Sequence, residues 1–360
     1  MLKKSFAPLI LTTLLCGILL NSVILSYAKW SHVQIKHDDL PVFKDIYFAD
    51  KQKGWVAGVS GFGEDGMVFH TEDGGSSWEQ QELPANVKTL SRVFFVSPKI
   101  GWAVGQDGTI VATKNGGKDW KLQTSKVGNW LFDVFFINKN VGWAVGDTGT
   151  IIKTTNGGGR WNVLYGGKPG SGVGEGEIKL DDQGYFVEGP AILQGVCFVD
   201  ENTGWAVGQD GFILYTTDGG ERWKQQMPDT ESVLYSVSFI DANTGCAVGE
   251  DGSIVRTTDG GTTWKSHQGG GDPNLLEKFF RVSFAPKSQE GWVAGTGGTI
   301  LHTTDGGEKW EKQEKLSYEI KIPGGKSVVK KFSQELTSVF AIDQGHCWVV
   351  GQDWVFKYTK

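Results

Sequence analysis

Four charged residues stand at one position of a repeated apolar run, each directly before a Val or Ile: Asp45, Arg92, Asp133 and Arg281. The same position is Gly195, Ser236 and Ser338 in the other copies of the run. Two carboxylates beside a guanidinium could bind a polar ligand, or act as the acid and base of a glycosidase. They could also neutralise one another, because an unpaired buried charge is costly. The elements that carry these residues decide between the alternatives.

These runs belong to an internal repeat, whose fifth copy reads LYSVSFIDANTGCAVGEDGSIVRTTDGGTTW over residues 234–264. A Gly-Trp type dipeptide places its second residue at Trp55, Trp102, Trp143, Trp205, Cys246, Trp292 and Trp348. A second signature, T-x-[DN]-G-G-x-x-W, ends at Trp78, Trp120, Trp161, Trp223, Trp264 and Trp310. The two aromatic positions are 18 residues apart in five of the six copies, which indicates one structural unit per repeat.

Each unit contains four short strand-like runs separated by turn sequences. In the fifth copy these runs are Val233–Ile240, Gly245–Gly249, Ser253–Thr257 and Trp264–His267. Four-stranded antiparallel units repeated every ~40 residues are typical of the blades of a β-propeller. The sequence therefore predicts an all-β propeller over residues 29–360.

The two ends of the chain complete the count of blades. The Gly-Trp position occurs seven times, but the Thr-to-Trp turn occurs only six times. The chain ends where a seventh turn would begin, and Trp30 stands where that turn would end. We expect residues 30–36 to be the outer strand of the seventh blade and to pair with residues 354–358, which closes the ring and removes its open edge.

The polar residue of each turn has an expected structural role, because a short polar side chain can accept backbone N–H groups in a tight turn. These residues are Asp73, Asn115, Asn156, Asp218, Asp259 and Asp305. We interpret the repeated Trp side chains as packing residues rather than as a platform for sugars or bases.

The leader, the net charge and the cysteine and histidine positions exclude several classes of protein. Residues 1–28 have the order of a signal peptide, or of an N-terminal membrane anchor if they are not cleaved. The net charge of −6 argues against nucleic-acid binding. Cys197, Cys246 and Cys347 follow the leader, and we interpret them as small buried side chains. No His or Cys spacing indicates a metal, and every Gly-Gly belongs to the repeat, so we predict no metal or cofactor.

Long insertions and an acidic ring mark one face of the expected ring. Residues 162–193, 265–278 and 311–335 lengthen connections between blades and are expected to project from the same face. The first and last of these could close over the channel as a lid or partner grip, or remain solvated loops. Six acidic residues between second and third strands lie on this face: Asp65, Asp107, Asp147, Asp210, Asp251 and Asp353.

The turn resembles the Asp-box of sialidases, some endoglucanases and sortilin-type receptors. The whole unit, GWAVG followed by DGxIxxTTDGGxxW, resembles the Ycf48/HCF136-like family of photosystem II assembly factors over residues 30–360. This resemblance implies an exported propeller that binds membrane-protein subunits and assists their assembly without catalysis. Photosynthetic members carry an arginine-rich surface patch, whereas the five Arg of this chain are spread over five units: Arg92, Arg160, Arg222, Arg256 and Arg281.

We therefore predict a non-enzymatic, monomeric scaffold that binds membrane or secreted protein subunits. Its location is expected to be periplasmic or otherwise extracytoplasmic, and lumenal in a photosynthetic source. The alternative is a carbohydrate-active or carbohydrate-binding propeller, which predicts exposed Trp130, Tyr185 and Phe186 beside a carboxylate pair. That pair would be Asp45 and Asp133, or would come from Glu175, Glu177, Asp181 and Asp182.

Overall fold

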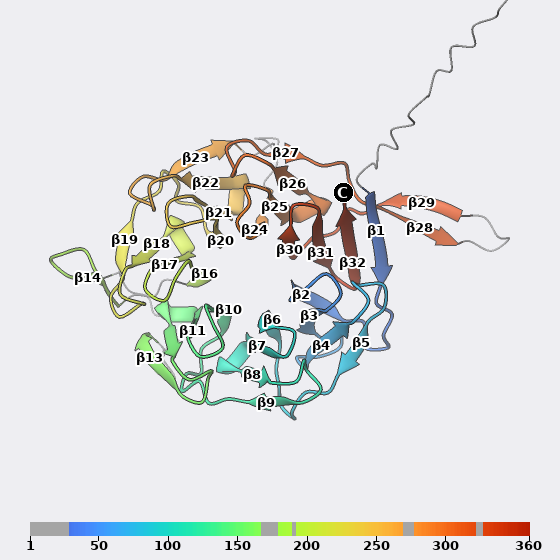
Figure 1. Cartoon of the computed structure of the whole chain (residues 1–360), viewed down its shortest axis with the longest axis horizontal. Helices are drawn as coiled ribbons and strands as arrows, with labels where there is room; N and C mark the ends of the chain where they lie inside the picture. The colour runs from blue at the N-terminus through green and yellow to red at the C-terminus, as the bar shows by residue number, and fades with distance from the viewer. Residues whose placement is uncertain (1–28, 167–178, 189–191, 269–276, 322–326) are drawn as a thin grey trace, which may run out of the picture.

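The computed structural model describes residues 29–166, 179–188, 192–268, 277–321 and 327–360, which form a ring of seven blades around a central channel (Figure 1). Each blade is a four-stranded antiparallel sheet with its first strand next to the channel. The predicted seven-bladed propeller is therefore confirmed. Among the described residues, no helix has the length and apolar character needed to span a bilayer.

The strands of the first six blades follow the chain from the channel outward. Blades 1 to 3 are β2 (Val42–Phe48), β3 (Gly54–Val59), β4 (Gly66–Thr71), β5 (Glu79–Gln81); β6 (Leu90–Ser97), β7 (Ile100–Gly105), β8 (Ile110–Thr113), β9 (Trp120–Leu122); and β10 (Leu131–Phe136), β11 (Gly142–Gly146), β12 (Ile151–Thr154), β13 (Trp161–Tyr165). Blades 4 to 6 are β16 (Leu193–Phe198), β17 (Gly204–Gly208), β18 (Ile213–Thr216), β19 (Lys224–Gln226); β20 (Leu234–Phe239), β21 (Gly245–Gly249), β22 (Ser253–Thr257), β23 (Lys265–Gln268); and β24 (Phe279–Phe284), β25 (Gly291–Gly295), β26 (Ile300–Thr303), β27 (Glu311–Lys312).

The seventh blade joins the two ends of the chain. Its strands are β30 (Ser338–Asp343), β31 (His346–Gly351), β32 (Trp354–Thr359) and, outermost, β1 (Lys29–Gln34). Strands β1 and β32 pair antiparallel from Lys29↔Thr359 to Gln34↔Trp354. The predicted closure by residues 30–36 is confirmed: β1 covers the edge of β32 and supplies the fourth strand of the seventh blade.

Neighbouring blades are joined by a recurring pair of aromatic rings. Trp143 of blade 3 stacks on Phe198 of blade 4 with ring centroids 3.6 Å apart, and its indole Nε1 donates to the carbonyl of Gly219 at 2.9 Å. Phe198 also meets the edge of Trp223. Four further joints have the same Trp–Phe stack and the same indole bond to a Gly: Trp55–Phe95, Trp102–Phe136, Trp205–Phe239 and Trp348–Phe48.

The fifth copy of the repeat replaces this Trp by Cys246, yet its hydrogen bond to the next blade is kept. Arg256, which pairs with Cys246 across the sheet, donates from Nε to the carbonyl of Gly306 at 2.8 Å. Cys246 is a buried free thiol, as are Cys197 and Cys347. The guanidinium thus reaches the turn that an indole reaches in other blades.

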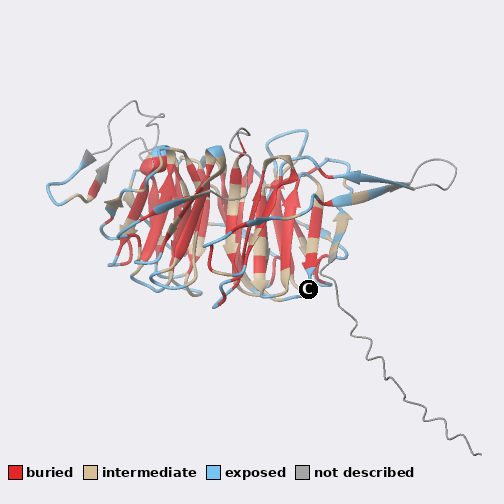
Figure 2. Cartoon of the chain, turned by 90° about the horizontal axis from the view of Figure 1, so that it is seen from above, coloured by how far each residue is buried: buried red, intermediate tan, exposed pale blue. Residues whose placement is uncertain are grey.

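Two small hairpins extend from the disc near the face that carries the connections between blades (Figure 2). They are β14 (Lys179–Leu180) with β15 (Phe186–Glu188), and β28 (Ser317–Lys321) with β29 (Ser327–Lys331). Both point outward from the rim rather than over the channel (Figure 1), so these described parts of the insertions do not form the lid considered above. The 265–278 insertion lies mostly outside the described residues.

The aromatic joint gives a direct stability test. We expect Trp143→Ala to lower the free energy of unfolding by about 3–5 kcal/mol, because it removes a buried ring and leaves the Gly219 carbonyl without its donor. Urea denaturation followed by circular dichroism measures this loss. Lys121→Ala, at an exposed position, is the control; a loss below about 1 kcal/mol for the Trp variant would contradict the role of the joint.

Candidate binding site at the channel mouth

A β-bulge near the start of the innermost strand shapes the mouth of the channel. In blade 3 the pairing of β10 with β11 shifts between Leu131 and Asp133, which leaves Phe132 as the extra residue. Blades 1, 2, 4, 5 and 6 have the same shift at the corresponding place. A bulge re-aims the extra side chain. Here the extra residues line a recess, together with Thr337 of blade 7: Lys44, Ser91, Phe132, Gln194, Tyr235 and Phe280.

This recess has a volume of about 330 Å³ and opens on the face of the inter-blade connections. Two aromatic pairs form part of its wall. Trp130 and Phe132 lie nearly parallel with centroids 5.9 Å apart, and Tyr235 and Phe280 are 5.7 Å apart. The exposed residue Glu335 also lines the recess. The mouth therefore offers apolar surface next to charged groups, as ligand sites commonly do.

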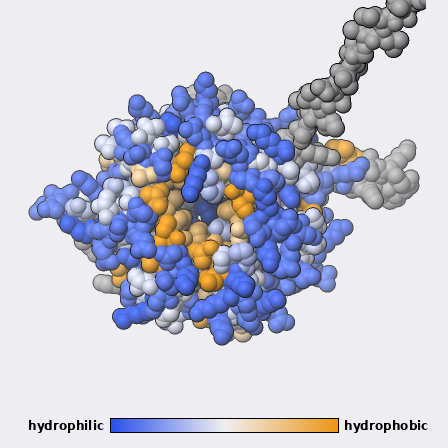
Figure 3. All heavy atoms as spheres, in the orientation of Figure 1, coloured by the Kyte–Doolittle hydropathy of each residue, from blue (hydrophilic) through white to orange (hydrophobic). Residues whose placement is uncertain are grey.

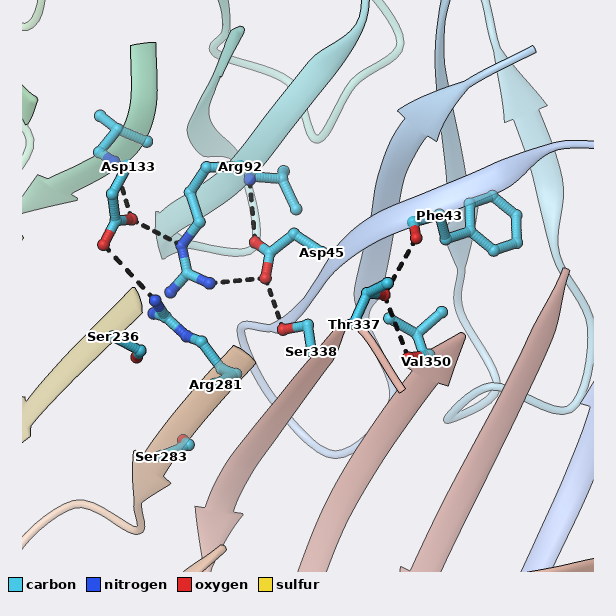
Figure 4. A network of polar contacts seen from close by, with 12 residues as sticks. Phe43, Asp45, Arg92, Asp133, Ser236, Arg281, Ser283, Thr337, Ser338 and Val350 are labelled. Carbon is cyan, nitrogen blue, oxygen red and sulfur yellow. Dashed lines mark hydrogen bonds and ion pairs between the residues drawn. The ribbon is translucent and has the colours of Figure 1, made fainter. Parts of the chain in front are cut away.

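The four charged residues singled out in the sequence meet at this recess (Figure 4). Arg92 lies between two carboxylates: its Nη1 is 2.6 Å from Oδ1 of Asp45, and its Nε is 2.8 Å from Oδ1 of Asp133. Arg281 of blade 6 reaches across the channel, with Nη1 3.5 Å from Oδ2 of Asp133 on blade 3. The cluster therefore links blades on opposite sides of the ring.

Both carboxylates also bind backbone N–H groups of the next blade. Asp45 Oδ2 accepts from the amide of Val93 at 3.0 Å, and Asp133 Oδ2 accepts from the amide of Val196 at 3.0 Å. The hydroxyl of Ser338 donates to Asp45 at 2.6 Å. Each acid thus fastens its own blade to the following one. The oxygens of both carboxylates are therefore engaged by backbone amides and by side chains of neighbouring blades.

Burial sets the protonation of the cluster. Burial raises the pKa of Asp133 to about 6, against the opposing effect of the Arg92 guanidinium. Burial also raises the pKa of Asp45, again opposed by Arg92 and by the Ser338 hydroxyl. As the pH falls through about 6, Asp133 takes up a proton and the cluster gains positive charge. Its attraction for an anionic group should grow accordingly.

Arg281 is the guanidinium that faces the recess most openly. Its side chain is 16% exposed, against 9% for Arg92, and its contact with Asp133 is long. Both arginines line the recess. Arg92 is held by two acids, so Arg281 is the group of the cluster with most freedom to contact a ligand.

The Asp-box residues lie on the opposite face and bind within their own turns. Asp73 Oδ1 accepts from the amides of Ser76 and Ser77 at 2.9 Å and from the hydroxyl of Thr71 at 2.8 Å. The corresponding side chains accept in the same way from their Thr and from the amide four residues on: Asn115, Asn156, Asp218, Asp259 and Asp305. The Oδ1 atom of each of these six side chains is therefore engaged within its own turn.

The residues expected of a sugar site do not come together. Phe186 is buried against Phe212, and the ring of Tyr185 covers the guanidinium of Arg222 at 3.7 Å. Only Trp130 lies at the channel mouth. Asp181 pairs with Arg222, and Glu175 and Glu177 lie outside the described residues. Within the described residues, no group of three or more His, Cys, Asp or Glu side chains could hold a metal ion.

The bulge residues could not be recognised in the sequence, because a bulge depends on which residues pair across the sheet. Aligning the inner strands places Lys44, Ser91, Phe132, Gln194, Tyr235, Phe280 and Thr337 at one position, directly before the charged one. This position varies between copies and holds aromatic, polar and charged residues. That variation, in an otherwise regular repeat, is the sequence feature that could have indicated a binding surface. The structure thus defines a closed seven-bladed β-propeller with a charged, aromatic-lined recess at one mouth of its channel.

Comparisons with known proteins agree with this class. The sequence profile of the family described as photosynthesis system II assembly factor YCF48 matches residues 23–128 and 223–354, about two thirds of the chain. The chain therefore belongs to the YCF48 family of photosystem II assembly factors. No curated protein sequence matches it significantly.

Solved structures of low sequence identity share the fold. A structure described as YCF48 bound to D1 peptide is 18% identical with a TM-score of 0.67, and the match covers 93% of this chain and 97% of that one. YCF48 from Cyanidioschyzon merolae is 19% identical with a TM-score of 0.65, covering 92% and 98%. U3-55K has a TM-score of 0.66 at 9% identity, covering 91% and 98%, which shows how widely this ring is shared.

The ion pairs of the cluster predict how Arg92→Met changes the pKa of Asp133 and the stability of the protein. Losing the guanidinium removes the charge that opposes protonation, so the pKa of Asp133 should rise above about 6. The variant should also lose about 3–5 kcal/mol of stability, because it leaves a buried carboxylate without its partner. Carboxyl NMR titration and urea denaturation measure the two effects.

The sign of the pH dependence follows from the raised pKa. Between the ordinary value of 3.8 and about 6, the folded protein keeps a proton that the unfolded chain has released. The contribution of Asp133 to stability therefore falls as the pH rises through this window. The control for Arg92→Met is Arg160→Met, which lies in an exposed turn. It should change neither the pKa of Asp133 nor the free energy of unfolding. An unchanged Asp133 titration in Arg92→Met would show that the two groups are not coupled.

Proposed function

We propose that this propeller is a non-catalytic, exported scaffold that binds a polypeptide segment of a membrane-protein subunit and assists the assembly of an envelope complex. The recess carries the proposal. It combines two aromatic pairs with the partly exposed guanidinium of Arg281, and its charged floor is fixed by four blades of a rigid ring. An aromatic wall suits an apolar side chain, and the guanidinium suits a backbone carbonyl or a carboxylate.

Family membership supports a role in assembly, and one similar structure is described as YCF48 bound to D1 peptide. That description supports a polypeptide as the ligand here as well. The carbohydrate alternative has less support, because the expected aromatic residues are dispersed and both buried acids are bound to backbone amides and Arg92.

The remaining parts of the proposal concern location and assembly state. Residues 1–28 would direct the chain across a membrane and be removed, or remain as an anchor. The propeller would then act in the periplasm, or in a lumen if the source is photosynthetic. The ring closes on itself through β1 and β32, so a single copy suffices for the fold and we propose that it acts as a monomer.

Affinity purification from solubilised membranes tests the function. We expect a membrane-protein subunit to co-purify with the wild type, as identified by mass spectrometry. Phe132→Ala with Phe280→Ala should reduce its recovery at least about tenfold, since one well-packed aromatic anchor is commonly worth about 2 kcal/mol or more. Lys121→Ala, on an outer strand, is the matched control and should retain the partner.

A second arm addresses the enzymatic alternative. The purified wild type should release no sugar from a panel of glycosides. Recovery of no membrane or secreted polypeptide, together with turnover of a glycoside that Asp133→Asn abolishes, would overturn the proposal.

A further inference from the structure

The hairpin of β28 and β29 is an arm that extends beyond the rim of the ring, beside blade 7 (Figures 1 and 2). Among the described strands its two members pair only with each other, from Ser317↔Lys331 to Lys321↔Ser327. Both valines of β29 are exposed, Val328 by 41% and Val329 by 69%. Apolar surface is visible on the arm beside a largely hydrophilic rim (Figure 3). We refer to this hairpin as the projecting arm.

The base of the projecting arm is fixed in the core of the propeller. Leu316 and Phe332, which stand directly before β28 and after β29, are buried, and the amide of Phe332 donates to the carbonyl of Leu316 at 2.7 Å. The ring of Tyr318 lies 4.6 Å from the ring of Trp354 in blade 7. These contacts hold the arm in a defined direction, while residues 328–331 remain exposed.

The outer edge of β29 presents backbone groups that do not bond to β28. In an antiparallel pair of strands, hydrogen-bonded and non-hydrogen-bonded residue pairs alternate. The bond between Phe332 and Leu316 sets this alternation, and it places the N–H and C=O groups of Val329 and Lys331 on the side away from β28. A strand edge of this kind readily accepts a further strand.

The other small hairpin shows how this chain covers such an edge. The segment that leads into β15 lies along β19, the outermost strand of blade 4. The amide of Phe186 donates to the carbonyl of Trp223 at 2.7 Å, and Tyr185 pairs with Lys224. No described segment lies along β29 in this way. The projecting arm therefore has an edge that the described part of the chain leaves for another strand.

The charge of the projecting arm indicates which kind of strand fits it. The sequences of its two strands, SYEIK and SVVKK, contain three Lys and one Glu, although the whole chain has a net charge of −6. Like charges on facing strands are destabilising and opposite charges are stabilising. Two copies of the arm would repel each other, because both present Lys330 and Lys331, whereas a strand with carboxylates would be attracted.

We infer that the projecting arm is a docking site for an extended, acidic polypeptide segment of a partner, which adds to the outer edge of β29. The backbone of this segment would bond to Val329 and Lys331, and its carboxylates would lie next to the two lysines. In this mode of recognition main-chain hydrogen bonds give affinity and side chains give specificity. The arm is separate from the recess, so the inference goes beyond the proposed function and does not depend on it.

Binding of defined peptides to the purified full chain tests the projecting arm. The first probe is a labelled peptide with the block Glu–Glu–Val–Val–Thr between Gly and Ser residues. The second has Lys in place of both Glu, and the third is the first peptide with N-methyl groups on the backbone amides of the block. Fluorescence anisotropy should show binding of the first peptide, and at least about tenfold weaker binding of the other two.

Variants of the arm make the result specific. Lys330→Glu with Lys331→Glu should weaken binding of the acidic peptide at least about tenfold and should allow the lysine peptide to bind instead. Val329→Pro removes an amide on the outer edge but no bond within the hairpin, and should also weaken binding. The matched control is Lys118→Glu with Lys121→Glu, which reverses two exposed lysines of blade 2 and should leave binding unchanged.

Three outcomes would overturn the inference. The first is that the acidic peptide binds no tighter than its lysine or N-methylated form, and the second is that the folded Lys330→Glu, Lys331→Glu protein binds it like the wild type. The third is self-association that this variant abolishes, without peptide binding, because the arm would then belong to a second copy of the chain. None of these measurements depends on whether a membrane-protein subunit co-purifies, so failure here and failure of the proposed function are distinguishable.

Discussion

The stacked Trp–Phe pair between neighbouring blades is the interaction on which the ring depends. A four-stranded blade cannot bury both of its faces alone, so each must pack against the next. The stack of Trp143 on Phe198 buries two rings, and the indole bond to Gly219 fixes the angle at which one blade meets the other. Arg256 shows that this bond is retained even where Cys246 has replaced the indole. Together with the β1–β32 closure, these joints make the innermost strands a fixed frame.

That frame leaves the channel-facing residues free to differ between blades. Their side chains alternate along each inner strand, so residues two apart form successive layers of the channel. Bulge residues form the recess, and the next layer holds Arg92 and its partners. The layer after that contains the packed rings of Tyr47, Phe94 and Phe340. Seven nearly identical strands can thus present chemically distinct surfaces at two mouths. The buried acids contribute to the frame through their amide bonds, and Arg281 is the member of the cluster that faces the recess most openly.

Much of this arrangement could be predicted from the sequence because it repeats. The recurring Trp positions predicted the number of blades, and the split repeat at the two chain ends predicted that residues 30–36 pair with residues 354–358. Alignment of the inner strands also brought the four charged residues to one layer. The recess could not be predicted in this way, since Phe132 faces it only because a bulge shifts the pairing. The burial of Phe186 could not be predicted either, because it depends on packing against Phe212, which lies between strands β17 and β18.

The charged cluster obstructs the channel between its two mouths. Arg281 reaches Asp133 from the opposite side of the ring, while Arg92 joins Asp133 to Asp45, so ion pairs cross the channel between its mouths. A polypeptide passing through would have to separate buried charges, and breaking such pairs is costly. Under the proposed function, a partner segment therefore gains more by engaging the recess than by threading the channel.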